Sequence, residues 1–442
     1  MKEYRRKDGN RTLCMAPWTH TYLSPQTERR MCCASTEQAE SFEQYIDTGS
    51  NKKEYNPKTL DKHWNSEHMK SVRRRMMAGE ELPECQVCNK KLLNTDVYRD
   101  YFNHLFGHKE DDLWEKTNED GSTELPVVSF DYRFSNLCNF KCRMCGDMLS
   151  SQWESEQRNN NMWSPETQPW MAEPIRSKIK NFQEDQVEKE FAQAVDEHRI
   201  EEIYWVGGEP LMYEQHWKYM KQIVDNGDAD KVYVRYNTNL NRIKYKGIDL
   251  YKDLLVHFRD WQICASIDGT GIIGEWIRDG LDYTQWLDNF RQGIKIATHG
   301  RQMRLDLTIT TPGLLDIKNM FRLSKQLNVE LLTKVTFAFT PDIVLSPIAL
   351  PRKLLNEIVD ELLDYIVPLA DSKQQSLIDV LNNLKTRPNF EETWPNEYKQ
   401  GWLEGKLKQE RIGQIRRDYK KTTLESIFEQ DKRLYDWWEG LG

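Results

Sequence analysis

Six short β-type segments alternate with longer helical patterns between residues 127 and 341 of this 442-residue chain. Each segment is rich in Val, Ile, Tyr, Phe and Thr and is followed by turn residues, as strands are. The segments are Val127–Phe134, Glu202–Val206, Lys231–Tyr236, Gln262–Ile267, Arg304–Thr310 and Lys334–Thr340. Because helices between successive strands favour parallel pairing, we expect an α/β fold with a parallel sheet, open or rolled into part of a six-stranded β/α barrel.

The chain outside this core has a different character. A helix is predicted near the N-terminus, beginning at Asn65 or Ser66 and ending at Gly79, with apolar Met69, Val72 and Met76 on one face. A polar stretch of 23 residues, Gln152–Pro174, follows the first strand's loop, and such lengths are uncommon unless functional. We expect four parts: a loop-rich module at 11–95, a linker at 96–126, the core at 127–341 and a helical C-terminal region at 342–442.

Composition restricts the function. Lys and Arg total 62 against 70 for Asp and Glu, a net charge of -8 without the basic field of non-specific nucleic-acid binders. A local basic stretch remains, which is either a solvated helix face or a nucleic-acid contact; it comprises Lys406, Lys408, Arg411, Arg416, Arg417, Lys420 and Lys421. The start, Met1 to Asn10, has no apolar run, and no 18 uncharged apolar residues are contiguous, so we expect a cytoplasmic protein without a membrane partner.

Nine cysteines are distributed unevenly, and an odd, clustered set in a reducing compartment favours metal binding over disulfides. Cys138, Cys142 and Cys145 follow the first predicted strand directly, with C-x3-C-x2-C spacing. Three thiolates on one loop can hold an iron–sulfur cube and leave its fourth iron open to a cofactor or substrate. A structural zinc site usually needs four ligands, and the nearest histidines, His104 and His108, lie in the linker. We therefore expect a [4Fe-4S] cluster here.

Together with later landmarks, this motif resembles the radical S-adenosylmethionine (SAM) superfamily. The landmarks follow three successive strands: Gly207-Gly208-Glu209-Pro210, Thr238-Asn239 with Leu240 in place of the family's Gly, and Ser266-Ile267-Asp268-Gly269. The resemblance implies that the Gly-Gly-Glu turn holds the methionine amino group of SAM.

Further roles also follow from the resemblance. Ser266 and Asp268 would bond the ribose, and Phe140 and Met144 would flank the adenine. Arg278, in the family's Glu-aromatic-Ile-Arg segment, would bind a carboxylate, or it is a surface helix charge. The implied reaction begins when an external donor such as flavodoxin or ferredoxin reduces the cluster. SAM is then cleaved to methionine and a 5′-deoxyadenosyl radical, which abstracts hydrogen from a substrate carbon.

The N-terminal cysteines are similar to the twitch or SPASM auxiliary-cluster module of this superfamily. The matching segments are Cys14 to Trp18, Cys32-Cys33, Trp64 to Glu67 and Cys85-x2-Cys88, with Thr27 in place of the family's Gly. The resemblance implies a second [4Fe-4S] cluster on Cys14, Cys32 or Cys33, Cys85 and Cys88. In the best-known members the module follows the core, and a structural zinc site is the alternative.

The sequence does not identify the substrate. Members with such modules modify peptides, nucleotides and small sugar-like molecules, and no strand-end residue selects one class. The alternative from another class is a non-catalytic iron–sulfur or zinc protein, such as an electron carrier. An electron carrier does not need the Gly207–Pro210 turn, which favours the enzyme.

Overall fold

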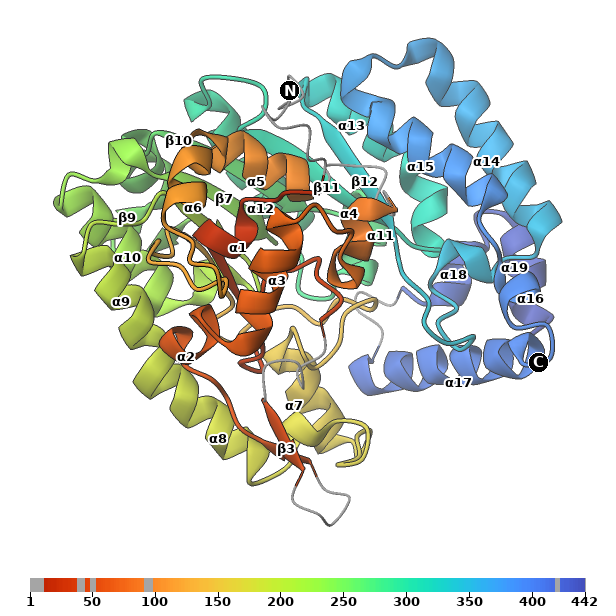
Figure 1. Ribbon diagram of the computed structural model, residues 1–442. Helices are drawn as coiled ribbons and strands as arrows, with labels where there is room; N and C mark the ends of the chain where they lie inside the picture. The colour runs from red at the N-terminus through yellow and green to blue at the C-terminus, as the bar shows by residue number, and fades with distance from the viewer. Residues whose placement is uncertain (1–11, 38–43, 48–52, 91–97, 418–421, 442) are drawn as a thin grey trace. The chain divides into compact units, whose positions relative to one another are not determined.

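The computed structural model describes residues 12–37, 44–47, 53–90, 98–417 and 422–441 (Figure 1). Most neighbouring strands are parallel. The chain divides into two units. The first comprises residues up to 138, 147–236 and 244–261, and the second comprises 139–146, 237–243 and 262–442. Each unit contains its own set of neighbouring parallel strands, with helices between them.

In the first unit the strand order is β7-β6-β5-β1-β2. Their bounds are β1 His20–Leu23, β2 Arg29–Arg30, β5 Ser129–Tyr132, β6 Glu202–Trp205 and β7 Tyr233–Thr238, of which residues 237 and 238 belong to the second unit. β1 pairs in parallel with β5, with His20 opposite Ser129, while β2 is its antiparallel hairpin partner. A strand of the N-terminal module therefore extends the sheet of the core, which the sequence did not indicate.

In the second unit β10 (Asp260–Ser266), β11 (Met303–Ile309) and β12 (Leu331–Val335) are neighbours, and both pairings are parallel. The predicted α/β class with a parallel sheet is confirmed. The last predicted strand, Lys334–Thr340, was wrong in its bounds. The chain leaves the ladder after Val335, because Leu331 to Val335 already span the register opposite Leu305 to Ile309.

Strand β5 alternates between an apolar and a polar face, as the period of two requires. Phe130 and Tyr132 pack against Phe191 of helix α9 (Glu188–Asp196) in edge or tilted contacts with centroids 5.5 and 6.2 Å apart. Ser129 and Asp131 lie on the opposite face and are buried among polar partners. The strand thus separates an aromatic core from a polar interior.

Helices cover the strands of the first unit, and α9 and α10 lie side by side (Figure 1). Helices α8 and α9 are joined by a π-helical turn at Gln183–Val187, and their apolar residues include Ile175, Ile179, Phe182, Phe191 and Val195. The helices of this unit are α1 Ala16–Thr19, α2 Leu60–Trp64, α3 Glu67–Met77, α4 Gln86–Asn89, α5 Tyr98–Phe106, α6 Glu110–Glu115, α7 Ser151–Asn159, α8 Ile175–Phe182, α9 and α10 Glu214–Asp225. The short remaining strands are β3 Tyr45–Asp47 paired with β4 Lys53–Tyr55, and β8 Lys244–Tyr245 paired with β9 Ile248–Asp249.

The predicted N-terminal helix is confirmed as α3, because the Ser66 hydroxyl caps it by accepting a hydrogen bond from the Met69 N–H. Two expected irregular segments contain helices instead: α5 and α6 lie within 96–126, and α7 lies within the stretch after the first loop. Their polar compositions hid helices that bury few side chains, since α7 buries Trp153 and Glu156.

Three helices of the second unit, α11 to α13, lie before Pro341, and α14 to α19 lie in the predicted helical C-terminal region. Their bounds are α11 Gly271–Ile277, α12 Tyr283–Ile296, α13 Ile317–Leu327, α14 Arg352–Ile366, α15 Gln375–Thr386, α16 Phe390–Thr393, α17 Tyr398–Arg416, α18 Leu424–Phe428 and α19 Lys432–Glu439. Helices α14 and α15 lie side by side (Figure 1). Gly401 and Gly405 let α17 approach Pro341 and Asp342, where a Cβ atom would meet backbone at 2.6 and 2.4 Å.

Parts of two predictions fall outside the described residues: the start of the chain, Met1 to Asn10, and Lys420 and Lys421 of the basic stretch. Within the described residues, a membrane-crossing helix is absent, because none combines the necessary length and apolar character.

Candidate functional site

The base of the cysteine loop is fixed within the first unit. The Asn136 amide donates to the backbone oxygen of Asp147 and to a Glu154 carboxylate oxygen, both at 2.9 Å. The Ser151 hydroxyl accepts from the Cys138 N–H at 3.2 Å, and the Ser151 N–H donates to the Asn136 carbonyl. These contacts join the residues just before and just after the three cysteines.

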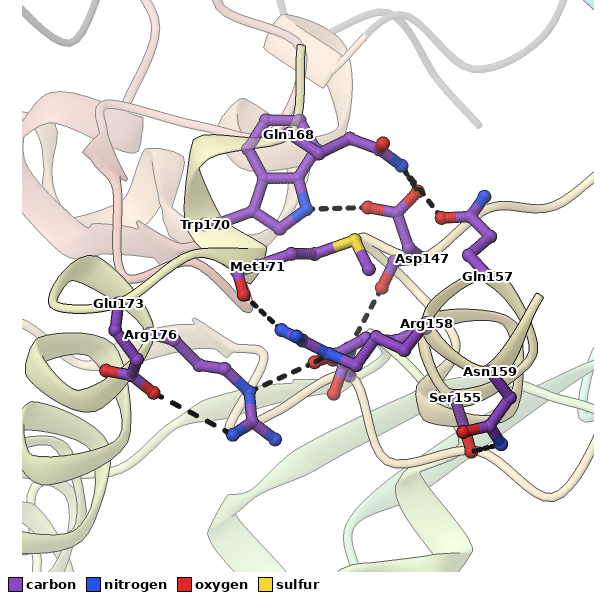
Figure 2. Close-up of polar contacts among 12 residues, drawn as sticks. Asp147, Ser155, Gln157, Arg158, Asn159, Gln168, Trp170, Met171, Glu173 and Arg176 are labelled. Atoms are coloured by element: carbon purple, nitrogen blue, oxygen red, sulfur yellow. Dashed lines mark hydrogen bonds and ion pairs between the residues drawn. The ribbon is translucent and has the colours of Figure 1, made fainter. Parts of the chain in front are cut away.

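The stretch after the loop folds back onto Asp147 (Figure 2). The Asp147 carboxylate accepts hydrogen bonds from the Gln168 amide at 2.9 Å and from the Trp170 indole at 2.6 Å. Gln168 also donates to Gln157 of α7, and Arg158 donates to the Met171 carbonyl. The 152–174 stretch is therefore a folded brace on the residue two positions after Cys145.

The Gly207–Pro210 turn meets the same loop base. The Glu209 N–H donates to the Leu137 carbonyl at 2.8 Å, and a Cβ on Gly208 would lie 2.3 Å from that oxygen. Gly207 has φ of 127°, a conformation that favours glycine. The Tyr213 hydroxyl accepts from the Gly208 N–H at 2.8 Å and donates to the Ser135 carbonyl at 2.6 Å. Tyr213, which sequence reasoning missed, thus ties the turn to the chain entering the loop.

The middle of the loop lies in the second unit, along residues 277–279. The Lys141 N–H donates to the Asp279 carbonyl and the Arg143 N–H to the Ile277 carbonyl, both at 2.8 Å. Gly280, with φ of 113°, leaves room for Phe140, whose ring would lie 2.7 Å from a Cβ there. Phe140 is buried for this reason, whereas Met144 is partly exposed.

Between these two backbone contacts, Arg278 reaches a cysteine. Its Nη1 donates to Cys142 Sγ at 3.8 Å, and its Nε lies 2.7 Å from Asp268 Oδ2 in an ion pair. Asp268 also accepts from the Thr308 N–H at 2.9 Å. Burial raises the pKa of the Asp268 carboxyl above its usual range, and the Arg278 charge opposes that rise. The surface-charge alternative for Arg278 is excluded, since its side chain is 11% exposed.

The remaining expected SAM contacts of the second unit lie at strand ends. Thr238 is the last residue of β7, and its hydroxyl accepts from the Leu240 N–H at 2.9 Å. The Asn239 amide donates to Asn139 of the cysteine loop at 2.9 Å. Ser266 ends β10 and is partly exposed. Cys264 of β10 is buried.

Four N-terminal cysteines line one small cavity in the first unit: Cys14, Cys32, Cys85 and Cys88. Burial is the main cause that raises the pKa of the Cys85 thiol to about 11, and Cys88 contributes. No three His, Cys, Asp or Glu side chains among the described residues lie close enough to hold a single metal ion. A cube is ligated at separate irons, so its ligands stand farther apart than those of one ion.

Cys33 points elsewhere. It is absent from the residues that line the cavity, and Asp131 lies close enough to raise the pKa of its thiol. Arg133 and Arg235 also lie close enough to influence its pKa, which burial raises to about 11. Of the two adjacent cysteines, Cys32 alone shares the cavity with Cys14.

Asn103 positions Cys14 from both sides. Its amide donates to the Leu13 carbonyl and its carbonyl oxygen accepts from the Met15 N–H, each at 2.9 Å. Asn103 lies on α5, in the segment predicted to be a linker, so the sequence carried no signal for this role.

Comparisons with known proteins agree with the cysteine loop. Residues 132–261 match the model of the radical SAM superfamily. No curated protein matches the chain. Among solved structures, the chain is similar to SuiB of Streptococcus suis bound to S-adenosylmethionine, with TM-score 0.32 and 12% identity over 58% of this chain and 49% of that chain.

SuiB without a named ligand matches with TM-score 0.33 and 11% identity over 69% of each chain. SuiB bound to precursor peptide SuiA matches with TM-score 0.34 and 12% identity over 68% of this chain and 69% of that chain. The chain spans about half the length of the first of these structures. The segment that matches the radical SAM superfamily model, residues 132–261, contains both the Cys138–Cys145 loop and the Gly207–Pro210 turn.

Proposed function

We propose that this protein is a radical SAM enzyme whose [4Fe-4S] cluster is held by Cys138, Cys142 and Cys145. The observation that carries the proposal is the hydrogen bond from Glu209 N–H to the Leu137 carbonyl, which ties the Gly-Gly-Glu turn to the residue before Cys138. A binding turn for SAM needs this proximity to the loop that holds the open iron.

The cluster and SAM together supply a 5′-deoxyadenosyl radical that abstracts hydrogen from a substrate carbon. The protein's own residues bind and orient SAM. In this proposal the backbone of Gly207 and Gly208 receives its amino group, with Glu209 and Pro210 fixing the turn. The other residues proposed to contact SAM are Phe140, Met144, Thr238, Asn239, Ser266, Asp268 and Arg278.

Arg278 and Asp268 interact with each other and not only with the proposed SAM site. They are already paired with each other at 2.7 Å, and Arg278 also contacts Cys142. Arg278 therefore contacts the cysteine loop directly, and Asp268 is joined to the loop through Arg278.

A second, auxiliary [4Fe-4S] cluster is proposed on Cys14, Cys32, Cys85 and Cys88, which line one cavity.

Two positions at which the sequence departs from the family's motifs still support the resemblance, one in the N-terminal module and one in the core. Thr27 and Leu240 stand where the family has Gly, and both adopt positive φ, 63° and 51°. Glycine adopts this conformation without steric cost, so the backbone at both sites is one that glycine favours.

The proposed ligand set closes the auxiliary cluster with four thiolates, and its role is to relay an electron or to brace the module. An external donor such as flavodoxin or ferredoxin would reduce the open cluster. Peptides, nucleotides and small sugar-like molecules are the substrate classes to test.

The experiment is anaerobic incubation of the reconstituted protein with SAM and dithionite, with 5′-deoxyadenosine and methionine measured by mass spectrometry. We expect both products in equal amounts, and none without the reductant. A protein that carries iron and sulfide but forms no 5′-deoxyadenosine would overturn the proposal in favour of a non-catalytic electron carrier.

A further inference from the structure

Arg278 is held in a fixed position against the cysteine loop. The two backbone hydrogen bonds from Lys141 and Arg143 flank it, because they end on residues 279 and 277. Its own N–H donates to the Gly274 carbonyl at 2.8 Å at the end of α11. The side chain between these contacts has little freedom to move away from Cys142.

Neighbouring glycines make this placement possible. A Cβ on Gly274 would lie 2.0 Å from the Gly269 carbonyl oxygen, so α11 can begin directly after the β10 end only with glycine there. A Cβ on Gly280 would lie 3.1 Å from the Asn139 oxygen. These two close approaches place the chain before Arg278 against Gly269 and the chain after it against Asn139.

The Arg278 guanidinium contacts a different group on each of its two sides. Asp268 approaches Nε at 2.7 Å, while Nη1 is directed to Cys142 Sγ at 3.8 Å. Arg143, which follows Cys142 in the sequence, has its guanidinium carbon 3.9 Å from the centre of the Trp276 ring. Arg278 therefore directs an N–H to a proposed cluster ligand.

We propose that Arg278 is a positioning and tuning residue: it donates an N–H···S hydrogen bond to the Cys142 thiolate and raises the reduction potential of the open cluster. The proposal rests on the proposed function. Hydrogen bonds to cluster sulfurs and nearby positive charge stabilise the more negative, reduced cluster. Asp268 orients the guanidinium, in the way that outer partners orient metal ligands.

The test is a redox titration of the reconstituted protein, with the reduced cluster followed by electron paramagnetic resonance with and without SAM. We expect Arg278→Gln to shift the midpoint potential of the SAM-responsive cluster to a more negative value. Arg278→Lys keeps the charge but lacks the guanidinium fork, so a smaller negative shift is expected. Arg291→Gln, which removes a half-exposed arginine of α12, is the matched control and should leave the potential unchanged.

Each outcome decides the inference. A purely structural role would lower thermal stability or cluster yield but leave the potential of the remaining cluster at the wild-type value, which overturns the inference. If the Arg278→Gln variant binds no cluster, the Arg278→Lys variant is the test. A midpoint potential of Arg278→Lys equal to that of the wild type also overturns the inference. A wild-type protein without any SAM-responsive cluster signal would instead contradict the proposed function.

Discussion

The guanidinium of Arg416 donates a hydrogen bond to the backbone oxygen of Lys141 at 2.8 Å, across 275 residues of sequence. Arg416 is the last residue of α17, and Lys141 lies directly before Cys142. Its Nε also lies 3.4 Å from Asp279, whose carbonyl receives the Lys141 N–H. A residue of the predicted basic stretch therefore supports the cysteine loop, and at 2% exposed its side chain is no part of a solvated helix face.

Removing the Arg416 side chain should lower the stability of the second unit. Arg416→Ala removes the guanidinium from the Lys141 carbonyl and from Asp279, which keeps the Lys141 ammonium at 3.7 Å. We expect the unfolding free energy to fall by about 1.5–3 kcal/mol. Iron content after reconstitution should fall as well. Chemical denaturation and iron analysis measure both effects. Lys408→Ala, which removes an exposed cation of the same helix paired with Asp342, should cost below about 1 kcal/mol. Equal effects of the two variants would contradict this assignment.

The open cluster should depend on each of its three thiols. Cys142→Ala leaves one iron without its protein ligand, and we expect 5′-deoxyadenosine formation to be abolished. Cys264→Ala is the control, because this buried cysteine of β10 lies outside the loop and should retain activity. Product analysis by mass spectrometry distinguishes the two. Retained SAM cleavage in Cys142→Ala would disprove the ligand assignment.

The auxiliary site separates two adjacent cysteines. Cys88→Ala should reduce the iron content from about eight to about four per chain and lower the melting temperature, while some SAM cleavage remains. Cys33→Ala should keep about eight irons, since its thiol lies outside the four-cysteine cavity. Anaerobic iron and zinc analysis is the measurement. About four irons with one zinc in the wild type would show a structural zinc site instead, and unchanged iron and stability in Cys88→Ala would show that no metal binds there.

The Gly-Gly-Glu turn should tolerate no side chain at its second position. A Cβ on Gly208 would lie 2.3 Å from the Leu137 carbonyl oxygen, so Gly208→Ala must displace the turn or the loop base. We expect SAM affinity to fall at least tenfold, a cost of about 1.4 kcal/mol, with the iron content retained. Gly146→Ala is the control, since nothing lies within 4 Å of a Cβ on the residue after Cys145. Equal SAM affinity of both variants in equilibrium dialysis would argue against a binding role of the turn.

Stability should decrease as the pH falls below about 6.5. Burial lowers the pKa of His216 to about 3, and its Nε2 lies 3.0 Å from the Tyr236 hydroxyl. The unfolded histidine binds a proton near pH 6.5 while the folded one does not, so the unfolding free energy falls by about 1.4 kcal/mol per pH unit between about pH 6.5 and 3. His216→Gln should flatten this dependence in melting curves taken from pH 7 to 4.5. An unchanged slope would show that other groups control it.

Much of the fold follows from local sequence. Five of the six predicted strands match observed strands with each bound within two residues, because alternating apolar residues specify a buried strand without knowledge of its partners. The sixth was displaced toward Thr340, where Phe337 and Phe339 are apolar but exposed. Aromatic composition alone cannot distinguish a strand from a segment that leaves the sheet.

The sequence by itself determined the α/β class, the cysteine loop after the first core strand and the order of the landmarks that follow it, since all depend on spacing along the chain. Only the tertiary structure decided which of Cys32 and Cys33 shares a cavity with Cys14, and that Asn103, Tyr213 and Arg416 hold the proposed sites in place. These choices depend on packing between residues 5 to 275 positions apart. Adjacent side chains leave the backbone in different directions, and contacts with distant segments decide which of them enters a site.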